Sequence, residues 1–196
     1  NGRLQWRILW NESRMMSDKR FIMETMTLDN LEVKSPKPIS TEINTGIVES
    51  KREAIAGGLK KLLADSYCLM LMSQNYHWNV QGMNFRTIHL MTEEHYTDLF
   101  EAVDEVAEII RALGFKAPGT MTEFNDLTSL NLPNSSLSEQ EMIADLLEGH
   151  EAVARTSRDC LSLCDNSKDE VTIDLLTDRM NYHEKTAWML RSMLEK

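Results

Sequence analysis

The sequence is poor in residues that interrupt helices and in residues that form cross-links. Its 196 residues include only four prolines and eight glycines, a composition that favours helix. The three cysteines, Cys68, Cys160 and Cys164, are odd in number and form no CxxC pair, so we expect reduced, buried thiols and no disulfide framework. No apolar run approaches the ~18 residues of a membrane span. Residues 1–10 are too short and too interrupted by arginine for a secretory signal. We therefore expect a cytoplasmic protein that does not enter a membrane.

Basic residues are also in the minority. The net charge is −10 and the isoelectric point about 5.0, which argues against a generally basic nucleic-acid surface and suits a protein that attracts cations. The first twenty residues are an exception, because five basic and two acidic side chains give them a charge of +3. The proline-containing stretch at 34–38 predicts an extended linker. We therefore expect a flexible extension over residues 1–45, either a DNA-contacting arm or a plain tail, and one folded domain over residues 46–196.

Apolar residues recur at spacings of three and four over four long segments, about 49–80, 84–114, 138–164 and 167–194. Gly82 suits the end of the first helix. Ser138-x-x-Glu141 and Ser167-x-x-Glu170 are capping boxes that predict the starts of the third and fourth helices. Residues 115–137 are too long for a plain turn and hold a possible short helix at 121–127. Such a connection joins parallel neighbours in helix bundles, so the pattern predicts an all-α, ferritin-like four-helix bundle with a short helix in its crossover.

Two common metal motifs are missing from these helices. None of the five histidines has a glutamate three positions before it, so the Glu-x-x-His pairs of the usual di-iron bundle are absent. HExxH is absent too, which excludes a zincin-type protease. We expect His150 in the core or an interface, and His183 with Glu184 at the surface or an interface. The interior of the bundle is not expected to hold a metal site.

Five residues with metal-ligand chemistry stand instead between positions 77 and 108. They are His77, His89, Glu93, Asp104 and Glu108. On a helix His89 shares a face with Glu93, and Asp104 shares one with Glu108. Imidazole with carboxylate suits iron, zinc or manganese. His89 and Asp104 are about 22 Å apart along one helix at ~1.5 Å per residue, too far for one metal ion. Either the two pairs are unrelated, or a two-fold mate of the chain supplies Asp104 and Glu108 to the other three residues.

These residues carry a specific resemblance. The sequence resembles the Dps family, the DNA-binding proteins from starved cells or mini-ferritins. The resemblance lies in the motif HWNVxGxxFxxxH from His77 to His89, in Glu93, and in VDExAExxRxLG from Val103 to Gly114. The stretch EKTAWMLR at 184–191 resembles the family's last helix, and the likeness runs from about Thr41 to Lys196.

The resemblance implies a hollow homododecamer with ferroxidase sites at its two-fold interfaces. His77, His89 and Glu93 would come from one subunit, and Asp104 and Glu108 from its mate. The metal would be non-haem iron, with neither haem nor nucleotide. Trp78 matches an aromatic residue beside the site that can intercept oxidising equivalents, or it serves in packing. The family often has Asp where this chain has Glu93.

The resemblance also implies acidic entry pores, and Asp165, Glu170 and Asp174 match the residues that line them. The alternative is a charged helix start, where acidic groups favour the N-terminal dipole.

The activity implied is that of an iron-sequestering ferroxidase. It would oxidise Fe(II), with hydrogen peroxide as oxidant, store Fe(III), and protect the cell and its DNA from oxidative damage. The alternative is a structural DNA-coating protein with little oxidase activity. We expect DNA binding to be weak or absent, because the extension has few cations and the body is acidic.

Overall fold

The computed structural model describes residues 40–165 and 167–194. These residues form five helices and no strand: α1 (Glu49–Asn79), α2 (Phe85–Ala112), α3 (Met121–Leu127), α4 (Glu139–Cys164) and α5 (Glu170–Leu194). Residues 40–48 precede the first helix without regular structure. Residues 1–39 lie outside the described residues, so the extension predicted over residues 1–45 stays a prediction. No helix in the described part of the chain is long and apolar enough to cross a membrane.

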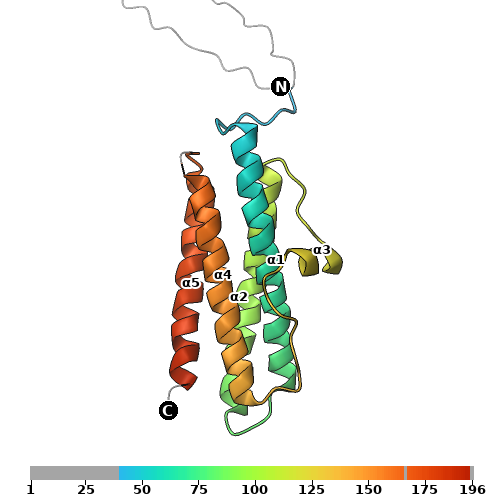
Figure 1. The fold of residues 1–196 in the computed structure, drawn as a ribbon, viewed down its shortest axis with the longest axis vertical. Coiled ribbons are helices and arrows are strands. Elements are labelled where there is room, and N and C mark those ends of the chain that lie inside the picture. Colours follow the sequence, from blue (N-terminus) through green and yellow to red (C-terminus); the bar gives the residue numbers. More distant parts are fainter. Residues whose placement is uncertain (1–39, 166, 195–196) are drawn as a thin grey trace, which may run out of the picture. The chain divides into compact units, whose positions relative to one another are not determined.

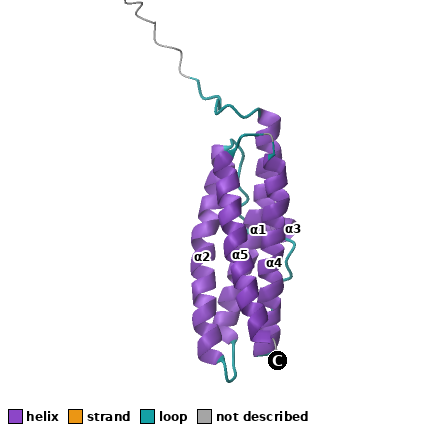
Figure 2. Ribbon diagram, turned by 90° about the vertical axis from the view of Figure 1, so that its left-hand side faces the viewer, coloured by secondary structure: helices purple, strands orange, loops and turns teal. Residues whose placement is uncertain are grey.

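The four long helices lie side by side as a bundle (Figures 1 and 2). Helix α1 packs against α2 and α4, and α4 packs against α5. The connection after α2 returns along α1 to the other end of the bundle, so that α2 and α4 run in the same direction (Figure 1). The short helix α3 lies within this connection and packs on α1, where Phe124 stacks on Tyr67 with ring centroids 4.3 Å apart. The predicted four-helix bundle with a crossover is confirmed.

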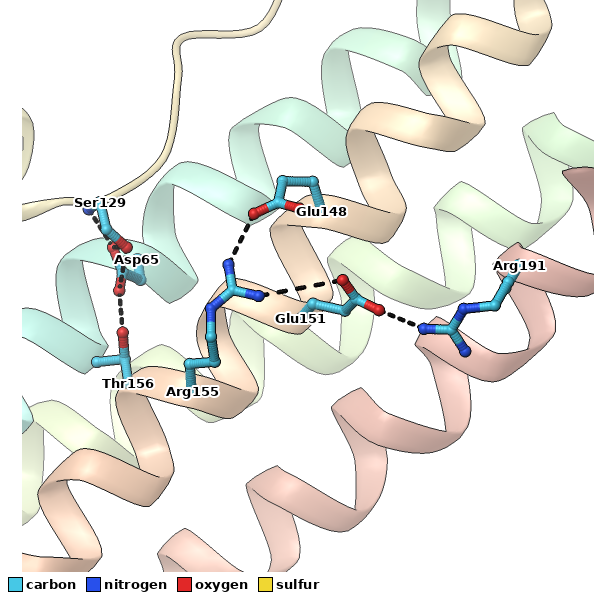
Figure 3. A network of polar contacts seen from close by, with 7 residues as sticks. All are labelled: Asp65, Ser129, Glu148, Glu151, Arg155, Thr156 and Arg191. Atoms are coloured by element: carbon cyan, nitrogen blue, oxygen red, sulfur yellow. Dashed lines mark hydrogen bonds and ion pairs between the residues drawn. The ribbon is translucent and has the colours of Figure 1, made fainter.

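A buried carboxylate holds the crossover against the bundle. Asp65 of α1 is fully buried and accepts hydrogen bonds from Thr128 Oγ1 (2.9 Å), from both the backbone N–H (2.6 Å) and the hydroxyl of Ser129, and from Thr156 Oγ1 of α4 (2.7 Å). Figure 3 shows Asp65 between Ser129 and Thr156. Because a desolvated carboxylate needs its hydrogen bonds, this group joins α1, the crossover and α4 at one point.

The helix ends agree with the predicted caps in part. Helix α1 ends at Asn79 with Val80 as its C-cap, so Gly82 lies in the connection and is not the cap itself. Ser138 and Glu141 form the expected capping box at α4. Helix α5, however, begins at Glu170 rather than near Ser167, and the carboxylate of Asp169 accepts from Thr172 N (3.2 Å). Lys168 has φ +60°, outside the right-handed helical region, so Ser167 lies before the helix and accepts from the Asp169 N–H instead.

The core is made of apolar side chains from the four long helices. The largest fully buried side chains are Tyr76, Ile55, Leu59, Leu62, Leu69, Met72, Ile88, Leu99, Ile110, Met142, Leu146 and Leu176. The three cysteines are free and buried, as expected. His150 is buried, and so is His183, whose prediction as a surface or interface group is wrong. His183 points into the bundle, where it bonds to His150 and Arg179, while Glu184 is exposed and pairs with Arg158.

Candidate metal centre

Two histidines meet across the short connection between α1 and α2. His77 lies in the last turn of α1, and His89 lies one turn into α2. Their rings stack with centroids 3.8 Å apart and planes inclined by 16°. His77 Nδ1 is 2.8 Å from the carbonyl oxygen of His89, and His89 Nδ1 is 2.9 Å from that of His77. The two residues therefore bind each other's backbone and hold the ends of the two helices together.

The reciprocal hydrogen bonds decide which ring nitrogen carries the proton. A carbonyl oxygen can only accept, so each Nδ1 must be the N–H donor. In the neutral imidazole the proton is then on Nδ1, and Nε2 keeps its lone pair. Neither Nε2 takes part in a hydrogen bond among the described residues. Metal-binding histidines are commonly oriented in this way, by a hydrogen bond from the other ring nitrogen to a carbonyl.

The connection itself is held from α4. Glu139 accepts hydrogen bonds from the backbone N–H of Asn84 (3.1 Å) and from its side-chain Nδ2 (2.8 Å). Gly82 has φ +139°, a backbone conformation that favours glycine, and a Cβ there would displace the Glu139 carboxylate, whose Oε2 lies 2.2 Å from its position. These contacts fix the start of α2 and, with it, the position of His89.

Aromatic rings surround the histidine pair on two sides. Phe85 stacks on His89 with centroids 5.2 Å apart, and the rings of Tyr96 and His77 form a T-shaped pair with centroids 5.3 Å apart. Trp78, the aromatic residue picked out by the sequence, is 69% exposed and makes no ring contact with either histidine in the described structure. Sequence reasoning missed Tyr96, although its position seven residues after His89 puts it on the same face of α2.

The carboxylates predicted as ligands are all exposed on α2. Glu93 follows His89 by one turn, and Asp104 and Glu108 lie three to four turns further on. None of the three carboxylates forms an ion pair or a hydrogen bond with another described residue. Nowhere in the described residues of one chain do three or more His, Cys, Asp or Glu side chains converge in a way that could hold a metal ion. A single chain thus brings together only the two histidines. Glu93 lies one helical turn after His89, and Asp104 and Glu108 lie further along α2.

Asp104 and Glu108 border a surface groove of about 560 Å³ between α2 and the crossover. Its apolar lining includes Leu63, Tyr67, Phe100, Pro118 and Phe124. Phe100 is 68% exposed although it is large and apolar. The second pair of predicted ligands therefore lies beside an apolar surface.

Known proteins share this helical fold. The ferritin-like domain family matches residues 56–196, most of the chain. DNA protection during starvation protein 2 of Bacillus anthracis, a Dps protein, is 34% identical over 138 residues, which cover 70% of this chain and 94% of that protein. The chain belongs to the Dps family.

Further relatives and solved structures match most of the chain. A low-temperature-induced protein of Nostoc is 39% identical over 155 residues, covering 78% of this chain and 87% of that protein. The crystal structure of a Dps protein from Vibrio cholerae, described as a member of the ferritin-like diiron-carboxylate proteins, matches with a TM-score of 0.75 and 28% identity over 81% of this chain and all of that one. The Dps structure from Mycobacterium smegmatis matches with a TM-score of 0.74 and 27% identity over 81% of this chain and 96% of that one.

The acidic residues predicted to line a Dps entry pore are close in the fold but not all in one groove. Glu170 and Asp174 occupy the first two turns of α5 and line a groove of about 680 Å³ with Glu105 and Asp178. Asp165 is exposed at the end of α4 and does not line that groove. The pore stays a prediction, because the three-fold contact would have to be made by further copies of the chain.

Proposed function

We propose that the chain is the subunit of an iron-storing shell of twelve copies whose two-fold interfaces oxidise Fe(II) with hydrogen peroxide. The observation that carries this proposal is the pairing of His77 and His89. Both rings are held with Nε2 free, next to an exposed carboxylate one turn away, in a chain that cannot complete the coordination by itself. Membership of the Dps family supports a general role in iron storage and protection.

The donor set suits Fe(II). Two neutral imidazole nitrogens from His77 and His89 and the carboxylate of Glu93 form one half of the site, and Asp104 and Glu108 of a mate would form the other half. Imidazole and carboxylate together favour borderline and hard cations, and the three carboxylates offset the charge of two bound Fe(II) ions in part. The apolar groove beside Asp104 supplies a surface on which the mate can pack. Exposed apolar surface of this kind commonly marks an interface.

The proposed chemistry is a two-electron reduction of peroxide. Two Fe(II) ions give one electron each, the O–O bond of hydrogen peroxide breaks, and two protons from solvent complete two water molecules. Pairing the ions in one site delivers both electrons to the same peroxide, so no hydroxyl radical leaves the site. The Fe(III) formed would hydrolyse and mineralise inside the shell. Acidic groups such as Glu170 and Asp174 would draw Fe(II) inward by their negative potential.

The first test combines sizing with stopped-flow kinetics. The double variant His77→Ala/His89→Ala should assemble as the wild type does, yet oxidise Fe(II) with peroxide at least about a hundredfold more slowly, the order of loss seen when residues that hold or orient a metal are removed. Glu53→Gln, which changes an exposed acid of α1 away from the site, serves as the control. Wild-type kinetics in the histidine variant would refute the assignment, and so would a wild-type chain that is monomeric in solution.

Mixing two inactive variants tests whether the site is shared between copies. One variant lacks the histidines (His77→Ala/His89→Ala), and the other lacks the distant acids (Asp104→Asn/Glu108→Gln). In a two-fold pair with one subunit of each kind, one site holds both defects and the other is intact. Random co-assembly should therefore restore about a quarter of the wild-type sites. Mixed assemblies as inactive as their parents would show that Asp104 and Glu108 do not act across an interface.

A second candidate function is DNA coating with little oxidase activity. Relatives with the name DNA protection during starvation protein and the positive charge of residues 1–20 favour it. A gel shift at low and high salt, with and without residues 1–40, separates the two functions. Because so few cations are available, we expect a weak shift that disappears at high salt and on removal of the extension.

A further inference from the structure

The three remaining histidines come together inside the bundle, away from the candidate metal centre. His95 of α2, His150 of α4 and His183 of α5 are 4%, 0% and 0% exposed. The ring centroids of His95 and His150 are 4.8 Å apart, and those of His150 and His183 are 5.1 Å apart. Their neighbours are Arg179 and Tyr182 of α5, with the guanidinium of Arg179 stacked 4.7 Å from the tyrosine ring.

A chain of hydrogen bonds runs through two of these rings. Arg179 Nη2 donates to Asp98 of α2 (2.6 Å) and lies 3.1 Å from His183 Nε2, and His183 Nδ1 is 2.9 Å from His150 Nδ1. A guanidinium has no acceptor, so His183 Nε2 must accept. In the neutral ring His183 Nδ1 then carries the proton and donates it to His150 Nδ1. The proton of His150 is thereby assigned to Nε2.

This arrangement has no place for an additional proton. Protonation of His183 would put an N–H on Nε2, directly against the N–H of Arg179. Protonation of His150 would put an N–H on Nδ1, against the N–H of His183. Either event replaces a hydrogen bond of about 3 Å by two opposed donors and leaves a buried cation beside a guanidinium.

The surrounding charges do not compensate for such a cation. Helix α2 contributes His95 and Asp98, and Asp98 is already paired with Arg179. Helix α5 contributes Arg179 and the phenol of Tyr182. No described charged residue of α1 contacts either ring. Burial is the main reason why the pKa of both His150 and His183 lies well below the ordinary histidine value. His183, His95 and Arg179 lower the pKa of His150 further, and Arg179 and His95 lower that of His183.

We propose that His150 and His183 form an acid-sensitive lock between α4 and α5, closed while both rings are neutral and opened by the first proton that either ring accepts. Acid then detaches α5 from the rest of the bundle. In an assembled shell the subunits would separate over the same range of pH and release their iron, a consequence that rests on the proposed function. The opening of the single subunit does not depend on that function.

The dependence on pH follows from linkage. The unfolded chain binds protons at these histidines near pH 6.5, whereas the folded chain does not until the pH is much lower. Above about pH 6.5 both histidines are neutral in the folded and the unfolded chain, so they do not reduce the free energy of unfolding. Below that pH the free energy of unfolding falls as the pH decreases. Each histidine makes the ratio of folded to unfolded chains drop about tenfold per pH unit, so the pair makes it drop about a hundredfold.

The test compares the wild type with His150→Gln/His183→Gln by urea unfolding at pH values from 7.5 to 4.5. Glutamine can accept from Arg179 through its oxygen and donate through its amide nitrogen, but it does not titrate. Below pH 6.5 each decrease of one pH unit should lower the ratio of folded to unfolded chains in the wild type by about a hundredfold more than in the double variant. Asn181→Gln, at an exposed position of α5, should retain the steep wild-type dependence. Parallel curves for the wild type and the double variant would overturn the proposal.

Imidazole nitrogen NMR of the wild-type protein covers the case in which the double variant does not fold. The lock requires that His183 carry its proton on Nδ1 and His150 on Nε2. It also requires that both rings stay neutral for as long as the protein remains folded. A folded protein with either ring charged near pH 6 would overturn the proposal independently of any substitution.

Discussion

The substitution Asp65→Ala should be among the most damaging single changes in the bundle, although Asp65 takes no part in the proposed chemistry. Its carboxylate accepts from four donors: the hydroxyl of Thr128, the backbone N–H and the hydroxyl of Ser129, and the hydroxyl of Thr156. Alanine leaves all four without their acceptor. Ser129 and Thr156 are directed at Asp65 (Figure 3), and of the three donor residues only Thr156 is buried.

The size of the loss can be worked out from these contacts. A hydrogen bond to a charged group contributes about 1.5–3 kcal/mol, and a buried donor without a partner costs about 1–3 kcal/mol. The contributions are not additive, because loss of the carboxylate also removes its own cost of burial. We expect Asp65→Ala to reduce the free energy of unfolding by about 3–5 kcal/mol, which lowers the midpoint of thermal unfolding by about 10 °C in a domain of this size. Asp65→Asn, which keeps one acceptor oxygen, should lose about half as much.

Urea unfolding followed by circular dichroism measures this loss, with the dependence on urea concentration unchanged. Asp159→Ala is the matched control. Asp159 follows Thr156 by three residues in α4 and is exposed, and its carboxylate forms no hydrogen bond or ion pair with the described residues. The control should change the free energy by no more than about 0.5 kcal/mol. Amide exchange should also accelerate at residues 128–130 in the Asp65 variants. A loss in Asp65→Ala within about 1 kcal/mol of the control would refute the view that this carboxylate anchors the crossover.

Two further predictions concern α1 and the thiols. Gly57→Ala should raise the free energy of unfolding by about 0.5–1 kcal/mol, because nothing lies within 4 Å of the added Cβ and alanine favours helix. In Gly58→Ala the free energy of unfolding should stay the same or fall by about 1–2 kcal/mol, since the added Cβ would lie 2.7 Å from Cys160 Sγ. Urea unfolding of the two variants measures the difference, and an equal gain in both would contradict the packing around Gly58. The thiols should not react with Ellman's reagent at pH 8 until urea unfolds the chain, because burial raises the pKa of Cys160 to about 12, that of Cys164 to about 11, and that of Cys68 as well. Rapid labelling of the folded protein would show that these thiols are accessible.

The bounds of the helices were predictable because local signals agree with one another. Apolar spacing and the capping box at Ser138 point to the ends that the structure has, whereas Gly82 lies a few residues beyond the end of α1. The start of α5 was mispredicted because two capping patterns overlap there. Ser167 precedes Glu170 by three positions, and Asp169 precedes Thr172 by the same spacing. Only the backbone at Lys168, with its positive φ, decides between them, and that conformation is not visible in the residue types.

The same limit explains what was missed among the histidines. His77 and His89 flank one short connection, so their proximity follows from the order of the helices. The partners of His183, by contrast, are distant in sequence, since His150 lies 33 positions away and Asp98 is reached only through Arg179. Within the run of polar residues around it His183 has the pattern of a surface position. A buried polar chain of this kind depends on three helices at once, and spacing along one helix cannot predict it.

Helix α2 connects the fold to the proposed function because one of its sides makes contacts within the subunit and the other carries acids without partners among the described residues. Its inner side is fully used within the subunit: Ile88 and Leu99 pack in the core, and Asp98 is paired with Arg179. Its outer side carries Glu93, Asp104 and Glu108, for which the described chain provides no cation and no donor. Carboxylates placed on one helix without partners repel one another, so the fold alone gives no physical reason for them. A bound cation would relieve that repulsion, and in the proposed site a second copy of the helix supplies the remaining ligands for it. This is why we attribute these acids to the assembly and not to the stability of the single subunit.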